Sequence, residues 1–68
     1  MEFKDSLKFR RERAGYTQTE LAKKVGVVQQ MIAGIETGVG RANHILVIEL
    51  AKVLDCSTDE LLGLKEIE

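Results

Sequence analysis

Cysteine and proline are scarce or missing in this sequence of 68 residues, and each absence narrows the class of protein. The single cysteine, Cys56, has no second thiol for an internal disulfide, so we expect a small buried apolar residue. One cysteine and one histidine are too few for a structural zinc site. Without proline or a low-complexity stretch, no linker separates two domains. We therefore expect one domain over residues 1–68 with no metal ion and no cofactor.

Long apolar runs are also missing. No segment approaches the roughly 20 apolar residues of a membrane-spanning helix, and the N-terminus lacks the basic-then-apolar pattern of a signal peptide. We therefore expect a cytoplasmic protein without a membrane partner, as its lone thiol also suggests. The sequence has no histidine beside a nucleophile, no cluster of metal ligands and no phosphate-binding glycine loop. We therefore do not expect an enzyme.

Net charge is low, at −1, but its sign changes along the chain. Residues 1–41 contain eight Lys and Arg against five Asp and Glu, a net of +3, whereas residues 42–68 contain two against six, a net of −4. Scattered charges are usually a solvated surface, but a basic half beside an acidic half can attract a polyanion to one side of the molecule.

Helical patterns separated by glycines fill the sequence, whereas strand-like alternation is absent. Capping-box patterns beginning at Thr17 and Ser57 mark two helix starts, and Asn43 is a further candidate N-cap. Gly26 and Gly63 follow two of the patterns, as helix-ending glycines do. We therefore predict an all-α fold of five short helices, over about residues 3–14, 18–25, 29–36, 44–54 and 58–62.

The apolar spacing also predicts which side chains are buried. In the first helix, one stripe contains Phe3, Leu7 and Ala14. Arg10 lies within this stripe, where its stem can pack while its charged head reaches water. The expected core of the fourth helix consists of Val47, Ile48, Ala51 and Leu54. This leaves Ile45 and Leu46 exposed as a candidate partner surface.

Residues 17–36 carry the functional signal. Two short helices joined by a tight glycine-containing turn cannot pack antiparallel, so they cross steeply in a helix-turn-helix arrangement. The second helix of such a motif projects as a ridge that fits a DNA major groove. Val28, Ile32 and Ile35 take its inward side, which leaves Gln29 and Gln30 on the outward N-terminal turn.

The outward residues of the second helix suit base reading. A glutamine amide combines a donor and an acceptor that match N6 and N7 of adenine, so Gln29 and Gln30 are candidate base readers. Ala33 can touch a thymine methyl group, and Gly34 permits close approach to the groove. Glutamine also favours any wet helix surface, but this position in the motif favours the base-reading interpretation.

Residues that flank this reading helix are candidate phosphate contacts. Gln18 begins the first helix of the motif, where free backbone N–H groups favour an anion. Thr37, Arg41 and Asn43 follow the reading helix and, with the amides of residues 38–40, can grip the DNA backbone. Such contacts fix the register of the protein without reading sequence.

The same residues resemble the Cro-like helix-turn-helix family, also called the XRE family, which includes the lambdoid phage repressors. The resemblance covers, in order and without gaps, residues 11–18, 21–27, 32–38, 50–54 and 57–62. Residues 25–30 (Val-Gly-Val-Val-Gln-Gln) are similar to the reading helix of repressors that use paired glutamines. The resemblance implies a compact five-helix, lambda-repressor-like fold that binds double-stranded DNA as a dimer on a two-fold operator, usually for repression of transcription.

The resemblance also implies roles for single residues. Gln29 and Gln30 read bases, Gln18 contacts phosphate and braces the reading amides, and Arg11 pairs with Glu36 close to the DNA backbone. A surface ion pair worth about 0–1 kcal/mol is the alternative for Arg11 and Glu36. The full set of candidate phosphate contacts is Arg11, Thr17, Gln18, Thr37, Arg41 and Asn43.

The sequence departs from the family pattern in the reading helix. Val28 stands where Ser or Thr often caps the helix, a loss of about 1 kcal/mol. Gly34 replaces a long polar reader that many members carry. These departures leave an alternative function open. The chain can instead be an antitoxin or adaptor that uses this fold mainly to bind a protein partner.

A homodimer is expected through the C-terminal region. The candidate interface residues are Cys56, Thr58, Asp59, Leu64 and Ile67. The sequence is compatible both with a complete small protein and with the N-terminal domain of a longer repressor.

Overall fold

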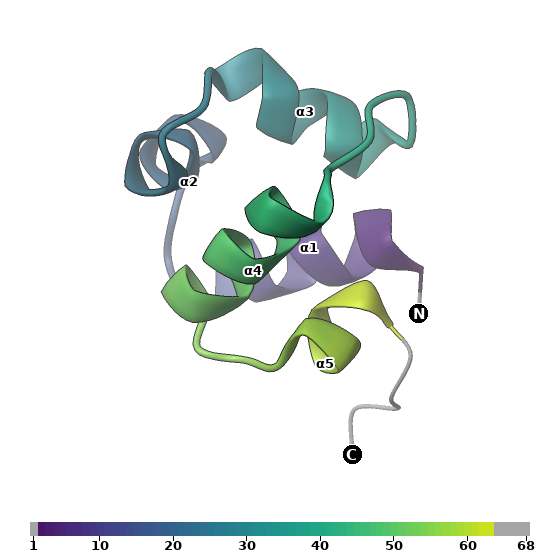
Figure 1. Ribbon diagram of the computed structural model, residues 1–68. Coiled ribbons are helices and arrows are strands. Elements are labelled where there is room, and N and C mark those ends of the chain that lie inside the picture. The colour runs from purple at the N-terminus through teal and green to yellow at the C-terminus, as the bar shows by residue number, and fades with distance from the viewer. Residues whose placement is uncertain (1, 64–68) are drawn as a thin grey trace.

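The computed structural model describes residues 2–63. Its helices are α1 (Phe3–Arg13), α2 (Gln18–Val25), α3 (Gln29–Thr37), α4 (His44–Val53) and α5 (Thr58–Leu62), as Figure 1 shows. The described range contains no strand. The predicted all-α fold of five helices is therefore confirmed. All five predicted helix starts match, and the C-terminal ends of α1, α3 and α4 differ from the prediction by one residue.

Side-chain caps begin three of the helices, as the sequence predicts. The Thr17 hydroxyl accepts the backbone N–H of Glu20 (3.1 Å), and the Glu20 carboxylate accepts the backbone N–H of Thr17 (2.9 Å). Ser57 and Glu60 make the same reciprocal pair at 3.1 and 3.0 Å. Asn43 caps α4 through its side-chain oxygen. These local hydrogen bonds fix where α2, α4 and α5 start.

A tight turn joins α2 to α3. Gly26 adopts a left-handed conformation (φ 76°), which a residue without Cβ takes at little cost, and it ends α2. The backbone N–H of Val27 then donates to the carbonyl of Ala22 (3.0 Å). In Figure 1, α2 is seen nearly end-on while α3 runs across the view, so the two helices cross steeply. This is the predicted helix-turn-helix arrangement.

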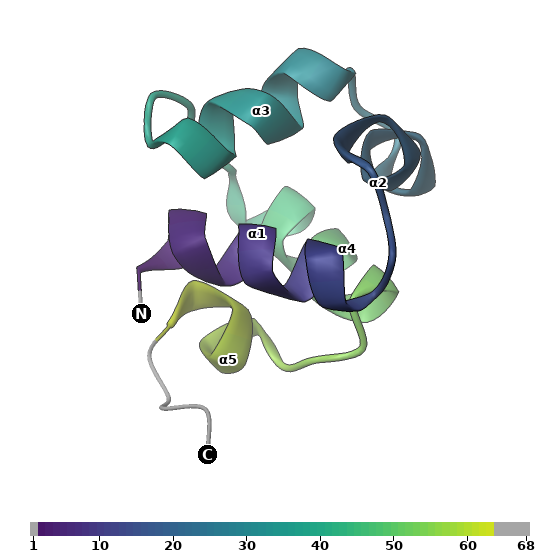
Figure 2. The same cartoon turned by 180° about the vertical axis from the view of Figure 1, so that it is seen from behind.

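Each of the helices α1 to α5 contributes buried side chains to the hydrophobic core. One side chain from each of α1 to α5 has no exposed surface: Leu7, Leu21, Ile32, Leu50 and Leu61. Full burial of such a side chain contributes about 1.5–3 kcal/mol. Figure 2 shows α1 and α5 stacked below α3, with α4 behind. A single core therefore fixes α3 relative to the rest of the molecule.

The predicted core of α4 was partly wrong. Leu46, expected to be exposed, is only 8% exposed, and it lies four residues before the fully buried Leu50. Ile48, expected in the core, is 40% exposed. Because residues 45–48 are all apolar, their sequence alone does not reveal the phase of the helix. Val28, expected on the inward side of α3, is also exposed.

The C-terminal half of α1 also corrects the sequence analysis. Ala14 is exposed just after the helix rather than part of its buried stripe. The stem of Arg10 packs as expected, but its guanidinium lies 3.8 Å from the Glu60 carboxylate and its Nε is buried without a hydrogen-bond partner. Ser6, which the sequence did not single out, is fully buried and donates to the Glu60 carbonyl (3.2 Å). Polar side chains of α1 therefore join α5 to the core.

Candidate nucleic-acid interface

The helix α3, which the sequence predicts to read bases, is anchored by its inward side chains. Ile32 and Ile35 are buried, and α3 packs against α2 and α1. This packing leaves Gln30 exposed and Gln29 and Ala33 half-buried. The predicted base readers on the first turn therefore lie on the side of α3 that faces away from the core.

A chain of hydrogen bonds connects the first reading glutamine to the other helices. The side-chain amide of Gln29 donates to Gln18 Oε1 (2.6 Å). The amide of Gln18 donates in turn to Glu36 Oε1 (3.0 Å). Arg11 donates from Nη2 to Glu36 Oε1 (3.1 Å) and from Nε to Oε2 (2.7 Å). The side chains of Arg11, Glu36, Gln18 and Gln29 thus form one network across α1, α2 and α3, which we call the polar network.

The hydrogen-bonding groups of its members determine which side chain donates and which accepts at each step of the polar network. A carboxylate only accepts hydrogen bonds, so Glu36 requires the NH2 group of Gln18 to face it. The oxygen of Gln18 must then face Gln29, which requires the NH2 group of Gln29 to face Gln18. Gln29 is left with its oxygen and its other amide N–H directed elsewhere. Its donor and acceptor are therefore fixed before any ligand arrives.

The Arg11–Glu36 pair is buried, unlike the surface pair that was the alternative. The Arg11 side chain is 11% exposed and that of Glu36 is 3% exposed. Arg11 also donates from Nη1 to the Tyr16 carbonyl (2.8 Å). The hydrogen bond to Glu36 raises the pKa of Arg11, although desolvation by burial opposes this. The pairing that the family resemblance implies is therefore confirmed, and its geometry is bidentate.

Gly34 faces the turn that follows α3. A Cβ placed on Gly34 would lie 3.6 Å from the backbone of Gly40. A Cβ on Gly40 would lie 3.1 Å from the Gly34 carbonyl carbon and 3.2 Å from the Ile35 nitrogen, closer than ordinary contact. The two glycines therefore let the turn pack directly on the helix backbone. From the sequence, we expect DNA to approach Gly34 closely. On the side where a Cβ of Gly34 would lie, that space is occupied by the turn at Gly40.

The backbone N–H groups of residues 38–40 are all hydrogen-bonded to carbonyls of α3. The N–H of Gly38 donates to the Ile35 carbonyl (3.1 Å), and those of Val39 and Gly40 donate to the Gly34 carbonyl (3.0 and 2.8 Å). The expectation that these amides grip the DNA backbone was therefore wrong, because they close the C-terminus of α3 instead.

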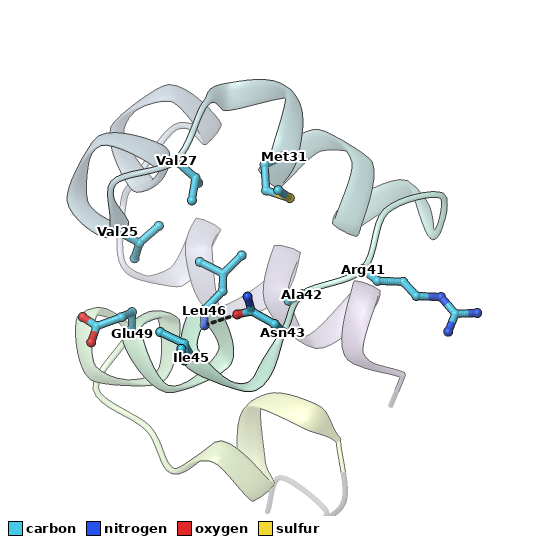
Figure 3. Close-up of a pocket in the computed structure, with 9 residues that line it drawn as sticks. All are labelled: Val25, Val27, Met31, Arg41, Ala42, Asn43, Ile45, Leu46 and Glu49. Carbon is cyan, nitrogen blue, oxygen red and sulfur yellow. Dashed lines mark hydrogen bonds between the residues drawn. The ribbon is translucent and has the colours of Figure 1, made fainter.

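The other candidate phosphate contacts occupy two places. Thr17 adjoins Gln18 at the start of α2, where its hydroxyl acts as the cap. Thr37, Arg41 and Asn43 are exposed along the segment from the end of α3 to the start of α4. The Thr37 hydroxyl donates to the Gly34 carbonyl (3.0 Å). In Figure 3 the guanidinium of Arg41 points away from the other labelled residues and toward the outside of the molecule.

Sequence reasoning missed one cation beside the reading helix. The side chain of Lys4 in α1 lies against Gly38, the residue that ends α3. Nothing in linear spacing connects these two positions, because only the packing of α1 against α3 brings them together. The excess of basic residues in the N-terminal half was the only available signal.

A second surface feature lies between the helix-turn-helix and the start of α4. It is an open groove of ≈ 540 Å³ whose lining is mainly apolar: Val25, Val27, Met31, Arg41, Ala42, Asn43, Ile45, Leu46 and Glu49. Figure 3 shows Met31 and Val27 on one side, Ile45 on the other, and Glu49 and Arg41 toward opposite ends. Ile45 is 61% exposed, as expected, whereas Leu46 forms the floor.

The dimer candidates are only partly covered by the structure. Cys56 and Thr58 are half-buried and Asp59 is exposed, all near the start of α5. Leu64 and Ile67 lie outside the described residues. Burial raises the pKa of the Cys56 thiol above its ordinary value, which disfavours the reactive thiolate.

Within residues 2–63, no group of three or more His, Cys, Asp and Glu side chains could hold a metal ion. None of the helices in this range has the length and hydrophobicity needed to span a bilayer.

Residues 7–61 match the family model described as helix-turn-helix. The chain is also 32% identical, over 63 residues, to the uncharacterized HTH-type transcriptional regulator YgzD of Bacillus subtilis (strain 168), covering 93% of this chain and 96% of that protein.

Solved structures of the P22 c2 repressor have the same fold. The crystal structure of that repressor with synthetic operator 9T superimposes with a TM-score of 0.89 at 29% identity, covering 96% of this chain and 98% of the other. The solution structure of the P22 c2 DNA-binding domain gives a TM-score of 0.87 at 28% identity, covering 100% of this chain and 92% of the other.

Proposed function

Because the chain belongs to the helix-turn-helix family of XRE-type DNA-binding transcription regulators, we propose that it binds a two-fold operator as a dimer and represses transcription. The P22 c2 repressor, which was crystallised with a synthetic operator, supports a repressor role for a chain of this fold. The observation that carries the proposal is the polar network, because it presents the Gln29 amide in one fixed orientation at the outer end of α3.

We propose that the first turn of α3 reads the bases. The free oxygen and N–H of Gln29 match the donor and acceptor edge of adenine, and exposed Gln30 offers the same pair to the next base pair. Ala33 is suited to contact a thymine methyl group. Gly34 adds no side chain, and the position its Cβ would take faces the turn at Gly40, so in this proposal it makes no side-chain contact with a base.

Phosphate contacts in this proposal come from both ends of the motif. Gln18 and Thr17 hold one stretch of backbone beside the start of α2, where free N–H groups favour an anion. Arg11, which is buried against Glu36, contributes to this contact by holding the carboxylate that orients Gln18. Thr37, Arg41 and Asn43 hold the other stretch. Asn43 can take part because its oxygen caps α4 and leaves its NH2 group available.

The proposed dimer forms through the C-terminal region, with Cys56, Thr58, Asp59, Leu64 and Ile67 as candidate contacts. We further propose a cytoplasmic protein that acts as one domain over residues 1–68, without a cofactor or catalytic activity. Sedimentation with and without operator checks the assembly: a dimer on DNA is expected, and a DNA-independent trimer would contradict the proposal.

Selection from a random duplex library at physiological salt tests the function. The expected result is an enriched two-fold motif whose half-site centres are separated by about one helical turn, 10–10.5 base pairs. Gln29→Ala and Gln30→Ala should each relax the preference at one base pair and cost about 1–3 kcal/mol on the selected site. No enrichment with the wild-type protein would refute operator binding.

Exposed Ile45 above the apolar groove favours a second candidate function, an adaptor or antitoxin that binds a protein partner. Exposed apolar side chains around a hollow are typical of protein-binding surfaces. Affinity purification compares the wild type with Ile45→Ser. A partner retained by the wild type and lost by the variant, with operator selection unchanged, would support this function, whereas equal recovery would exclude this groove as the binding site.

A further inference from the structure

The C-terminal end of the reading helix has few groups of its own that can hold a phosphate. The last turn of α3 contains no basic residue. The three amides that follow are bonded to carbonyls of α3, and Val39 at the tip of the turn is exposed and apolar. Residues 29–40, which make up α3 and its closing turn, therefore contain no cation, and Arg41 is the first one beyond them.

Lys4 of α1 supplies such a cation. A Cβ on Gly38 would lie 3.2 Å from Lys4 Cδ and 3.8 Å from Lys4 Nζ, so the stem of Lys4 runs over Gly38 and its ammonium ends beside it. Glycine at position 38 provides the space, because a side chain there would displace this stem.

The ammonium of Lys4 remains available to a ligand. Its side chain is 42% exposed, and its ion pair with Glu2 spans 3.9 Å to a carboxylate that is itself 77% exposed. Such exposed pairs are worth about 0–1 kcal/mol and are easily exchanged for a stronger anion. The other acid near the start of α1, Asp5, is exposed.

We propose that Lys4 binds a phosphate of the DNA strand that passes the C-terminal end of α3. This inference rests on the proposed function, since it adds a backbone contact to that interface. In this arrangement Lys4 of α1 supplies a cation beside residues 38–40, which carry none, and Arg41 supplies another just beyond them. Lys8, one helical turn further along α1, is exposed and extends the same basic face.

The alternative role of Lys4 is purely structural. A cation at a helix C-terminus interacts favourably with the helix dipole, so Lys4 can stabilise α3 without touching DNA. The two roles differ in their readouts. A purely structural role raises the free energy of unfolding only, whereas a phosphate contact also releases a counterion on binding and steepens the dependence of affinity on salt.

Lys4→Gln and Lys52→Gln form a matched pair for the test. Lys52 in α4 is also exposed (70%) and also makes a weak ion pair, 3.8 Å from Glu49, but it lies on a helix that packs against α2 and α5. Both variants lose one positive charge. Binding of each protein to a random-sequence duplex and to the selected operator is measured between about 50 and 200 mM salt.

The expected result is a slope of log Kobs against log salt that is shallower by about 0.9 for Lys4→Gln on both duplexes. Lys52→Gln and Lys4→Arg should keep the wild-type slope. A wild-type slope in Lys4→Gln would overturn the inference, even with a lower unfolding midpoint. A wild type that prefers no sequence, but whose slope falls in Lys4→Gln, would refute operator reading and leave the Lys4 contact supported. Absence of duplex binding by the wild type would overturn both.

Discussion

At the scale of single residues, Glu36 fixes the orientation of the Gln29 side-chain amide, because a carboxylate can only accept hydrogen bonds. The carboxylate orients Gln18, and Gln18 orients Gln29. Gln30 is exposed and belongs to no such chain in the described structure. The two glutamines are adjacent and chemically identical, but only the first is preorganised, so they should respond differently to substitution at Gln18.

A double-mutant cycle tests this difference. Gln18→Ala and Gln29→Ala share one hydrogen bond of 2.6 Å, so their costs in operator affinity should be non-additive by about 0.5–3 kcal/mol. Gln18→Ala and Gln30→Ala should be additive within about 0.5 kcal/mol. Fluorescence anisotropy with the selected operator measures all the affinities. Equal coupling in both cycles would show that Gln18 does not act through Gln29.

The glycines at positions 34 and 40 should also respond differently to alanine. A Cβ on Gly34 meets Gly40 at an ordinary 3.6 Å, so Gly34→Ala should gain about 0.5–1 kcal/mol of helix stability. Gly40→Ala places its Cβ 3.1 Å from the backbone of Gly34, which must shift, so it should lose about 1–3 kcal/mol. Urea unfolding of the two variants checks the sign, and two losses of equal size would contradict this packing.

At the scale of elements, α3 is the helix proposed to read the bases, and it is also one that starts without a side-chain cap. Val28 occupies the N-cap position in an extended conformation (φ −78°, ψ 154°), and it is exposed. The α2, α4 and α5 helices each begin with a capping side chain. The first turn of α3, which carries both glutamines, therefore lacks the capping hydrogen bond that the first turns of α2, α4 and α5 have.

Val28→Ser should stabilise the protein by about 1 kcal/mol, because a serine at this backbone conformation can accept a free N–H of the first turn. Asn43→Ala makes the opposite change on α4, because it removes the 2.8 Å capping hydrogen bond. It should lower the free energy of unfolding by about 1 kcal/mol. Thermal unfolding followed by circular dichroism measures both changes. A destabilised Val28→Ser would mean that Val28 makes contacts that outweigh a cap.

The capping box of α2 makes stability depend on pH. The backbone N–H of Thr17 and then its hydroxyl group lower the pKa of Glu20 below its ordinary value. A carboxylate with a lowered pKa in the folded state contributes stability at neutral pH, and this contribution is lost as pH falls through that pKa. Glu20→Gln should therefore show a smaller fall in unfolding free energy on acidification below pH about 5 than the wild type. Identical pH profiles would contradict a role for this box.

At the scale of the whole molecule, the Arg11–Glu36 pair joins helices that the core also joins. Arg11 belongs to α1, Glu36 to α3, and Gln18 attaches α2 to the same carboxylate. The pair is buried, so each charge depends on the other for its solvation. The orientation of Gln29 and the packing of the three N-terminal helices therefore depend on one charged centre.

Glu36→Gln should cost about 3 kcal/mol of unfolding free energy, because it leaves the buried Arg11 without a neutralising anion. The double variant Arg11→Met, Glu36→Leu should recover part of this stability while still losing operator specificity, since Gln18 is no longer oriented. Urea denaturation and operator binding measure the two effects. A cost for Glu36→Gln below about 1 kcal/mol would indicate a surface-like pair.

Most of the fold could be predicted from the sequence because helix ends are local. Capping boxes at Thr17 and Ser57 and the glycine at position 26 place their own helix boundaries. The phase of α4 was missed because four consecutive apolar residues hide it, and only packing against the other helices selects Leu46 over Ile48.

The connections of the polar network could be predicted, because the family resemblance implied the Arg11–Glu36 pair and the bracing of an α3 glutamine by Gln18. The backbone contacts around the end of α3 could not be predicted. The positions of Gln29 and Gln30 follow from the motif, and the Arg11–Glu36 pair followed from the family resemblance. The contact of Gly34 with Gly40 and that of Lys4 with Gly38 depend on how the backbone folds back on α3. No spacing rule connects such positions, so the loss of the turn amides as phosphate ligands could not be foreseen.

The hydrogen bond between Gln18 and Gln29 limits how this protein can be redesigned for a new target sequence. Replacing Gln29 by a reader of another base would leave the oxygen of Gln18 without its donor, unless position 18 is replaced as well. Gln30, by contrast, can be exchanged singly. Libraries for altered operators should therefore vary residues 18 and 29 as a linked pair and residue 30 independently, and natural relatives with different operators should have diverged in the same way.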